Sequence, residues 1–146
     1  MNDVIQTFVA SKKIAVVGAS PNKRSFANAA YCELKQKGYE VTPVNPNHSE
    51  VDGDRCASRL NELPPGVESA LFVLTPTQAE SEVIDAAATG IKRIWFQQGG
   101  KYDAAIRKAH ELGIETVSGK CILMYAAPVK GVHAFHRWLS KLFGRY

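Results

Sequence analysis

Residues 14–25 read IAVVGASPNKRS, an apolar run that stops at Gly18 and is followed by small and basic residues. The run is short and rich in β-branched residues, so residues 13–17 are predicted to form a buried strand. A helix is predicted over residues 25–37, because apolar side chains recur on one helical face and Gly38 follows as a C-terminal stop. This stretch therefore predicts a strand, a tight turn and a helix N-terminus in direct succession.

The alternation of strand and helix continues along the chain. Further strands are predicted at residues 39–44, 69–74, 93–96 and 114–117, with a short strand near Arg55 and Cys56. Helices are predicted at residues 78–89 and 102–112, with a single helical turn at residues 58–63. This order predicts an α/β fold with one doubly wound, mainly parallel sheet. Such a sheet binds ligands at the carboxyl ends of its strands, where the strand order reverses.

The C-terminal stretch, residues 130–144, predicts one extra helix with an apolar stripe and a basic opposite face. Three roles stay open for it: docking on the sheet, forming a homodimer contact, or lying on a membrane surface. The length of 146 residues suits a single domain, which we assign to residues 1–146.

Composition favours a cytoplasmic protein without membrane insertion. The formal net charge is +4, with 45% hydrophobic and 22% charged residues. No apolar run approaches the roughly 18 residues that span a bilayer, and the N-terminus lacks the basic region of a secretory signal. The three cysteines form no CxxC pair, which is typical of reduced thiols.

The distribution of basic residues and the absence of nucleic-acid-binding motifs predict an anionic small-molecule partner. Basic residues gather near both ends of the chain, which favours a negatively charged ligand. No motif typical of nucleic-acid binding is present, so nucleic acid is not an expected partner. Histidine and cysteine residues do not combine into a set with metal-ligand spacing, so no metal site is expected.

The turn after the first strand lacks the dinucleotide-binding fingerprint. Gly18 is the only glycine between Ile14 and Gly38, whereas that fingerprint needs three. The second strand ends in Val44 and Asn45, without the carboxylate that binds a ribose hydroxyl. An ordinary NAD site is therefore not expected.

The same turn keeps the features of an anion site. Gly18 permits a tight turn, Ser20 adds a hydroxyl donor, and the helix N-terminus, with Ser25 suited to its N-cap, offers unpaired N–H groups. Lys23 and Arg24 lie beside it and can contact phosphate oxygens. The alternative is that the two cations are only a solvated pair.

The second loop, PVNPNH, is predicted to hold an extended strip beside this anion site. The prolines around Val44 and Asn45 restrict the backbone. Val44 is placed against an adenine ring, Asn45 is placed to hydrogen-bond the ribose or base, and His48 to meet a further phosphate. The alternative is a proline-framed turn that needs no ligand.

Several of these segments together resemble a known family. They are VGASP with Arg24, GYEVTPVNP, LFVLTP, the W-x-Q-x-G of Trp95, Gln97 and Gly99, and the late Cys121. The combination, which covers about residues 5–121, resembles the small single-domain CoA-binding proteins of bacteria and archaea. These are similar to the CoA-binding domain of the succinyl-CoA synthetase alpha subunit. The family usually has an aspartate two residues before the cysteine and a proline after it, where this chain has Gly119 and Ile122.

The resemblance implies a Rossmann-like fold that binds coenzyme A or an acyl-CoA. It places the CoA phosphates on Gly18, Ala19 and Ser20, with Arg24 close by. The adenosine end would be bordered by Val44, Asn45 and Pro46. The rest of the pocket would be lined by Leu74, Thr75 and Pro76, and closed by Gln97 and Gly99. Lys23 and His48 are added to this set from charge and position alone.

Three functions follow from these observations. The first is a non-catalytic module that binds CoA or acyl-CoA. The second is an NAD(P)-binding oxidoreductase or regulator in which Lys23 and Arg24 take a 2′-phosphate. The third is a CoA-dependent enzyme or redox thiol protein that uses Cys121. We expect a binding module rather than an enzyme, since no nucleophile and base are paired in the sequence.

Overall fold

The computed structural model describes residues 3–97 and 99–126. A five-stranded sheet lies at its centre, made of β1 (Lys13–Val17), β2 (Glu40–Val44), β5 (Ser69–Phe72), β6 (Arg93–Gln97) and β7 (Glu115–Lys120). The helices are α1 (Asp3–Ala10), α2 (Phe26–Gln36), α3 (Pro76–Ala88) and α4 (Asp103–Glu111). Short elements complete the described fold: β3 (Glu50–Val51), β4 (Asp54–Arg55), and the 3-10 turns η1 (Leu60–Glu62) and η2 (Ile122–Met124).

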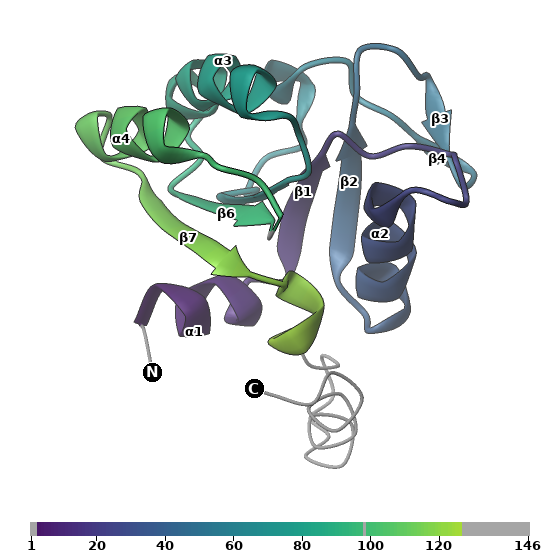
Figure 1. The fold of residues 1–146 in the computed structure, drawn as a ribbon. Helices are drawn as coiled ribbons and strands as arrows, with labels where there is room; N and C mark the ends of the chain where they lie inside the picture. The colour runs from purple at the N-terminus through teal and green to yellow at the C-terminus, as the bar shows by residue number, and fades with distance from the viewer. Residues whose placement is uncertain (1–2, 98, 127–146) are drawn as a thin grey trace.

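The strand order is β2-β1-β5-β6-β7, and all pairs within this sheet are parallel. The chain therefore moves outward from β1 to β2 and then returns to place β5 on the other side of β1. This reversal beside β1 is the topological switch point of a doubly wound sheet. Figure 1 shows β1 and β2 side by side, with their carboxyl ends at the top of the view. The predicted fold class, a Rossmann-like parallel α/β sheet, is confirmed.

Alternate residues of the strands belong to two cores, one on each face of the sheet. The core beneath α3 and α4 takes from the strands Ala15, Val17, Phe72 and Phe96. The core beneath α1 and α2 takes from them Ile14, Val16, Leu71 and Trp95. Figure 1 shows α3 and α4 on one side of the sheet and α1 on the other. Burial on both faces explains why β1 is apolar almost throughout rather than alternating.

The predicted elements form, with ends that differ by a few residues. Helix α3 begins at Pro76 rather than Gln78, because Thr75 caps it. Strand β7 continues to Lys120 rather than ending at Val117. The short strand predicted near Arg55 and Cys56 is β4, which pairs with β3 in a small antiparallel hairpin.

Helix α1 was not predicted from the sequence. Its Ile5 and Phe8 are buried, and the Phe8 ring lies edge-on to Trp95 with 5.2 Å between ring centroids. The helix has only eight residues, so its stability comes from this packing rather than from local preference.

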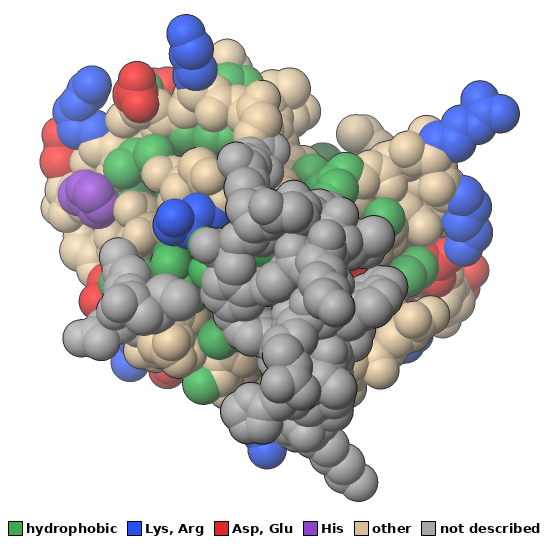
Figure 2. Space-filling view, turned by 60° about the horizontal axis from the view of Figure 1, so that its bottom comes forward, with side chains coloured by type: hydrophobic (Ala, Val, Ile, Leu, Met, Phe, Trp, Pro, Cys, Tyr) green, Lys and Arg blue, Asp and Glu red, His purple; other side chains and the backbone are tan. Residues whose placement is uncertain are grey.

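The predicted helix at residues 130–144 lies outside the described residues, and its three alternative roles stay predictions. Within residues 3–97 and 99–126, no helix is long and apolar enough to cross a membrane. Figure 2 shows the side of the molecule away from the carboxyl ends of β1 and β2, where basic and acidic side chains are scattered together along the edge.

Candidate functional site

A cleft of about 650 Å³ opens where β1, β2 and β5 end, at the switch point of the sheet. The lining residues come from the strand ends with the loops after them, and from α3. The strand-side lining residues are Val17, Gly18, Val44, Asn45, Pro46, Asn47, Ser58, Arg59, Val73 and Leu74. Those of α3 are Gln78, Ser81, Glu82 and Asp85. The volume lies within the usual range of small-molecule sites.

Gly18 lines the cleft directly after the end of β1. Its φ is +97°, and its N–H donates to Val44 O at 2.8 Å. A Cβ at this position would lie 2.2 Å from Val73 O, which is main chain of the neighbouring segment after β5. Glycine is therefore required twice, by the backbone conformation and by the close approach of two strand ends.

The loop from Ala19 to Ser25, called the first loop below, is held in place by hydrogen bonds from side-chain amides. Asn28 Nδ2 donates to Ser20 O at 2.7 Å, and Asn45 Nδ2 donates to Ala19 O at 2.9 Å. Ser25 caps α2 by accepting from the N–H of Asn28, as the sequence predicts. Among the described residues, the main-chain N–H groups of Ala19 and Ser20 have no hydrogen-bond partner. Two donors next to Gly18 are therefore available to an anion.

The two cations of this loop lie outside the lining of the cleft. Lys23 is exposed and forms an ion pair with Asp52, and this hydrogen bond and charge raise the pKa of Lys23. Asp52 also accepts from Asn28 Nδ2 at 2.9 Å. Arg24 is exposed, and its main-chain N–H donates to Asn22 Oδ1 at 3.0 Å. Lys23 therefore joins the first loop to the β3–β4 turn.

The end of β2 is braced by the segment that follows β4. Asn45 N–H donates to Ala57 O at 2.8 Å, and Ala57 N–H donates to Pro43 O at 2.9 Å. The Asn45 side chain bonds Ala19 O, and its Oδ1 accepts from Asn47 N–H at 2.9 Å. The Asn45 amide thus joins two loops of the protein. His48 is half-buried and lies outside the lining of the cleft.

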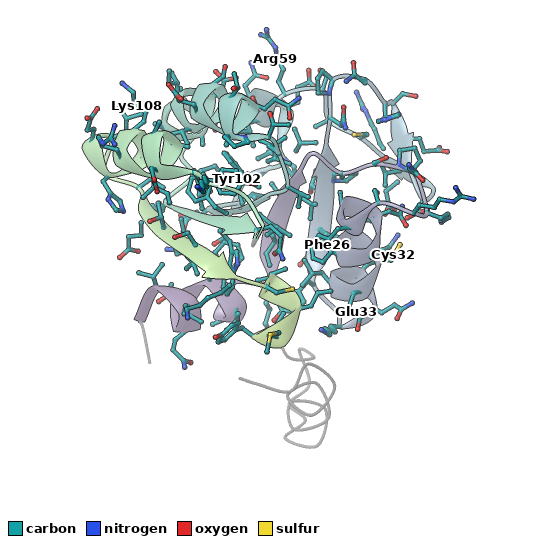
Figure 3. All side chains as sticks on the ribbon, viewed as in Figure 1. Phe26, Cys32, Glu33, Arg59, Tyr102 and Lys108 are labelled. Atoms are coloured by element: carbon teal, nitrogen blue, oxygen red, sulfur yellow. The ribbon has the colours of Figure 1, made fainter. Side chains whose placement is uncertain are left out.

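A second hollow, of about 470 Å³, adjoins the cleft and shares Val73, Leu74 and Gln78 with it. The remaining described lining residues are Phe26, Thr75, Pro76, Gln97, Gly99, Gly100 and Tyr102. Figure 3 labels Phe26 at the start of α2 and Tyr102 at the start of α4. The hollow therefore leads from the cleft toward the ends of β5 and β6.

Hydrogen bonds fix the walls of this second hollow. Thr75 and Gln78 form a capping box at the start of α3. Tyr102 Oη donates to Leu74 O at 2.7 Å. Gln97 is buried, and its Oε1 accepts from the N–H of Ile122 at 3.1 Å. Gln97 thus ties the end of β6 to η2.

The structure brings together most of the residues predicted for the site. The cleft is lined by Gly18, Val44, Asn45, Pro46 and Leu74. The second hollow is lined by Leu74, Thr75, Pro76, Gln97 and Gly99. Outside both linings lie Ala19, Ser20, Lys23, Arg24 and His48. The Ala19 side chain is fully buried in the core beneath α1 and α2, so only its main chain can face a ligand.

The polar wall on α3 was missed by sequence reasoning. Gln78, Ser81, Glu82 and Asp85 recur at helical spacing, which is a signal that a search for one polar face would have found. Burial and the neighbouring charge of Asp85 raise the pKa of the Glu82 carboxyl, and Arg59 opposes this rise. Arg59 was also missed, because nothing in its local sequence marks it as facing the cleft.

Cys121 lies at the N-cap of η2 and is buried. It lines neither the cleft nor the second hollow. The described residues that line the cleft include no cysteine and no histidine. Within residues 3–97 and 99–126, no group of three or more potential metal ligands is found.

The chain is similar to known proteins along most of its length. The uncharacterized protein YneT of Bacillus subtilis is 28% identical over 120 residues, covering 82% of this chain and 89% of that protein. A hypothetical protein from Pyrococcus horikoshii OT3 has a TM-score of 0.78 at 34% identity, covering 83% of this chain and 85% of that one.

A larger relative contains a similar segment. Subunit alpha of the ADP-forming acetate–CoA ligase II of Pyrococcus furiosus is 25% identical over 130 residues, covering 82% of this chain but 28% of the subunit. Residues 12–127 match the family described as CoA binding domain. With its parallel sheet, switch-point cleft and glycine turn, the chain belongs to the family of CoA binding domains.

Proposed function

We propose that this protein binds coenzyme A or an acyl-CoA in the switch-point cleft and acts as a non-catalytic binding module. The observation that carries the proposal is the turn at Gly18. There, two main-chain N–H groups that have no partner among the described residues lie beside a cleft with an apolar shelf. Unpaired N–H groups near a helix N-terminus stabilise phosphate oxygens. An apolar shelf suits a purine ring.

The arrangement of the site suggests how the ligand lies. The diphosphate is assigned to the main chain of residues 18–20, and the adenosine to the shelf of Val44 and Pro46. The pantetheine arm then runs past Leu74 into the second hollow, toward Gly99. This path follows the order of the strand ends, β2, β1, β5 and β6. Because the Asn45 amide already bonds Ala19 and Asn47, we assign Asn45 to positioning the two loops.

A binding role is favoured over catalysis by the chemistry of the lining. Nucleophilic catalysis needs a nucleophile within reach of a base. Cys121 is buried outside the cleft, and no described histidine lines it. The similar segment in the acetate–CoA ligase subunit spans about a quarter of that subunit, so ligase activity is not transferred to this chain. We also propose a cytoplasmic location, since the three cysteines are free thiols.

Ligand-dependent stabilisation tests the proposal. CoA at a hundredfold excess over its Kd should stabilise the native state by about 2.7 kcal/mol and raise Tm by roughly 6–10 °C. Acetyl-CoA should act similarly, whereas NADPH and ATP should have smaller effects. A larger shift with NADPH would favour the NAD(P)-binding alternative, and no shift with CoA at millimolar concentration would refute the proposal.

The first loop is tested by Arg24→Ala. We expect roughly threefold to tenfold weaker binding of CoA by titration calorimetry, because Arg24 lies beside the proposed phosphate site. The matched control is Arg107→Ala, which removes the same charge from an exposed position on α4. An unchanged Kd for Arg24→Ala would remove Arg24 from the site.

A further inference from the structure

Arg59 is the single cation among the described residues that line the cleft. Figure 3 shows it beside α3, at the top of the view. The guanidinium has no ion pair or hydrogen bond with another described residue. Its charge still acts on Glu82 of α3, where it works against the raised pKa of that carboxyl. Arg59 therefore presents its N–H donors to whatever enters the cleft.

The backbone that carries Arg59 is fixed on both sides. Before it, Ala57 forms a parallel bridge with Val44 at the end of β2. Next to it, Ser58 N–H donates to Glu62 Oε1 at 2.9 Å, and Ser58 Oγ donates to Glu62 Oε2 at 2.7 Å. A long side chain on a fixed backbone loses less freedom on binding than one on a loose loop.

The position of Arg59 along the cleft points to one part of the ligand. Gly18 lies at the end of β1, Val44 at the end of the neighbouring β2, and the 57–59 segment continues beyond β2. A ligand with its diphosphate at Gly18 and its adenosine along Val44 and Pro46 brings its ribose toward Arg59. In coenzyme A that ribose carries a 3′-phosphate, a doubly charged monoester that suits the forked donors of arginine.

We infer that Arg59 binds the ribose 3′-phosphate and makes the cleft selective for CoA over dephospho-CoA. This inference rests on the proposed function and assigns to Arg59 a part of the ligand that the first loop does not reach. Lys23 is already paired with Asp52, and Arg24 lies on the loop beside the diphosphate. Glu82 and Asp85 on α3 repel a phosphate, so Arg59 also offsets their charge.

The carboxylates of Glu82 and Asp85 on α3 disfavour phosphate groups that bind in the cleft away from Arg59. A phosphate that binds away from Arg59 faces Glu82 and Asp85 without a counter-charge. Specific sites commonly combine one attractive contact with such repulsion. The cleft should therefore accept a terminal phosphate at the Arg59 end and disfavour it along α3.

The test measures CoA and dephospho-CoA binding by titration calorimetry with the full chain. Wild-type protein should bind CoA at least tenfold more tightly than dephospho-CoA. Arg59→Ala should weaken CoA binding about tenfold to a hundredfold and change dephospho-CoA binding less than threefold. Arg59→Lys should fall between, because lysine keeps the charge and loses the fork. The matched control, Arg55→Ala, removes an exposed arginine of β4 outside the cleft and should leave both constants unchanged.

The outcomes separate this inference from the proposed function. Suppose that wild type binds both ligands, and that Arg59→Ala weakens the binding of CoA and dephospho-CoA equally or not at all. The 3′-phosphate assignment is then wrong, while the proposal that the protein binds CoA stands. If wild type binds neither ligand at millimolar concentration, the proposed function itself fails. The exposed position of Arg59 predicts only a small change of Tm for its variants, which thermal unfolding verifies.

Discussion

Two separate constraints require glycine at position 18, and each can be tested by substitution. Its φ of +97° favours glycine, and its Cα lies against the main chain of Val73. Gly53 has a similar φ of +86°, but a Cβ there would meet no atom within 4 Å. The two glycines thus have similar φ angles but differ in the space available for a Cβ atom.

Gly18→Ala should therefore cost much more stability than Gly53→Ala. We expect about 1–2 kcal/mol for Gly53→Ala from backbone strain alone. Gly18→Ala should lose at least about 3 kcal/mol, because the main chain must also shift. Urea unfolding measures both free energies. Equal losses would show that the approach of Val73 is not the constraint.

Glu82 is predicted to reduce stability at neutral pH. Its pKa is raised above 4.5, mainly by burial and then by Asp85, so the folded state holds its proton to higher pH than the unfolded state. Stability therefore falls as pH rises through the interval between the ordinary and the raised pKa. Glu82→Gln should be more stable than wild type at pH 7, and the difference should shrink below about pH 4.5.

The control for this variant is Glu80→Gln, on the exposed side of the same helix. Thermal unfolding of wild type and both variants from pH 4 to pH 8 separates the loss of the Glu82 carboxyl from the loss of a glutamate on this helix in general. A Glu82→Gln profile that runs parallel to wild type would contradict the assignment.

At the scale of elements, the second hollow depends on the start of α3. The Thr75 hydroxyl accepts from the N–H of Gln78 at 3.2 Å, and the Gln78 Oε1 accepts from the N–H of Thr75 at 3.1 Å. Pro76 follows as the first helical residue, where its missing N–H costs nothing. These contacts set where the wall of the hollow begins.

Thr75→Ala should lower the free energy of unfolding by about 1 kcal/mol, because it removes the N-cap. Thr77 lies two residues further along and is exposed, so Thr77→Ala should change the free energy of unfolding by less than about 0.5 kcal/mol. Chemical denaturation of the two variants measures the difference. If Thr77→Ala costs as much as Thr75→Ala, the loss reflects helix propensity in general rather than the cap.

The β3–β4 hairpin is also an element whose role is positional. Asp52 in its turn contacts Lys23 and Asn28, and Asp54 contacts Tyr31 and Lys35 on α2. The hydrogen bonds and cations around these two carboxylates lower their pKa values. The hairpin therefore holds the first loop and α2 in place beside the cleft.

At the scale of the whole molecule, the two cores have separate roles. The core beneath α3 and α4 contains Val17 and Val44, which also line the cleft. The core beneath α1 and α2 contains Phe8 and Trp95, which line neither the cleft nor the second hollow. Changes at Phe8 or Trp95 should therefore affect stability without changing ligand affinity.

Phe8→Ala tests this separation. Phe8 is fully buried, so its truncation should cost about 3–5 kcal/mol. CoA affinity, measured where the variant is still folded, should stay within about twofold of wild type. Gln6→Ala, at an exposed position of α1, is the control for stability. A large loss of CoA affinity in folded Phe8→Ala would show that the two cores are coupled.

Local sequence predicted the elements around the cleft well. The apolar run before Gly18, the proline-framed end of β2 and the strand before Thr75 each end where the structure places a strand end, within two residues. Parallel strands with helical crossovers have one geometric solution, so their carboxyl ends had to meet at one edge. The sequence could not show that the Asn45 and Gln97 amides bond other parts of the protein, since their partners are 26 and 25 residues away.

By itself, then, the amino-acid sequence determined the order of the five sheet strands and of the helices that follow β1, the doubly wound sheet and the loops that meet at its switch point. These follow from hydrophobic periodicity and from the turn residues, which act over a few neighbouring positions. Only the tertiary structure decided that α1 covers Trp95, that Lys23 pairs with Asp52, and that Arg59 and Glu82 share the cleft. Those outcomes depend on segments that are distant in the chain and meet only when the sheet and its helices pack.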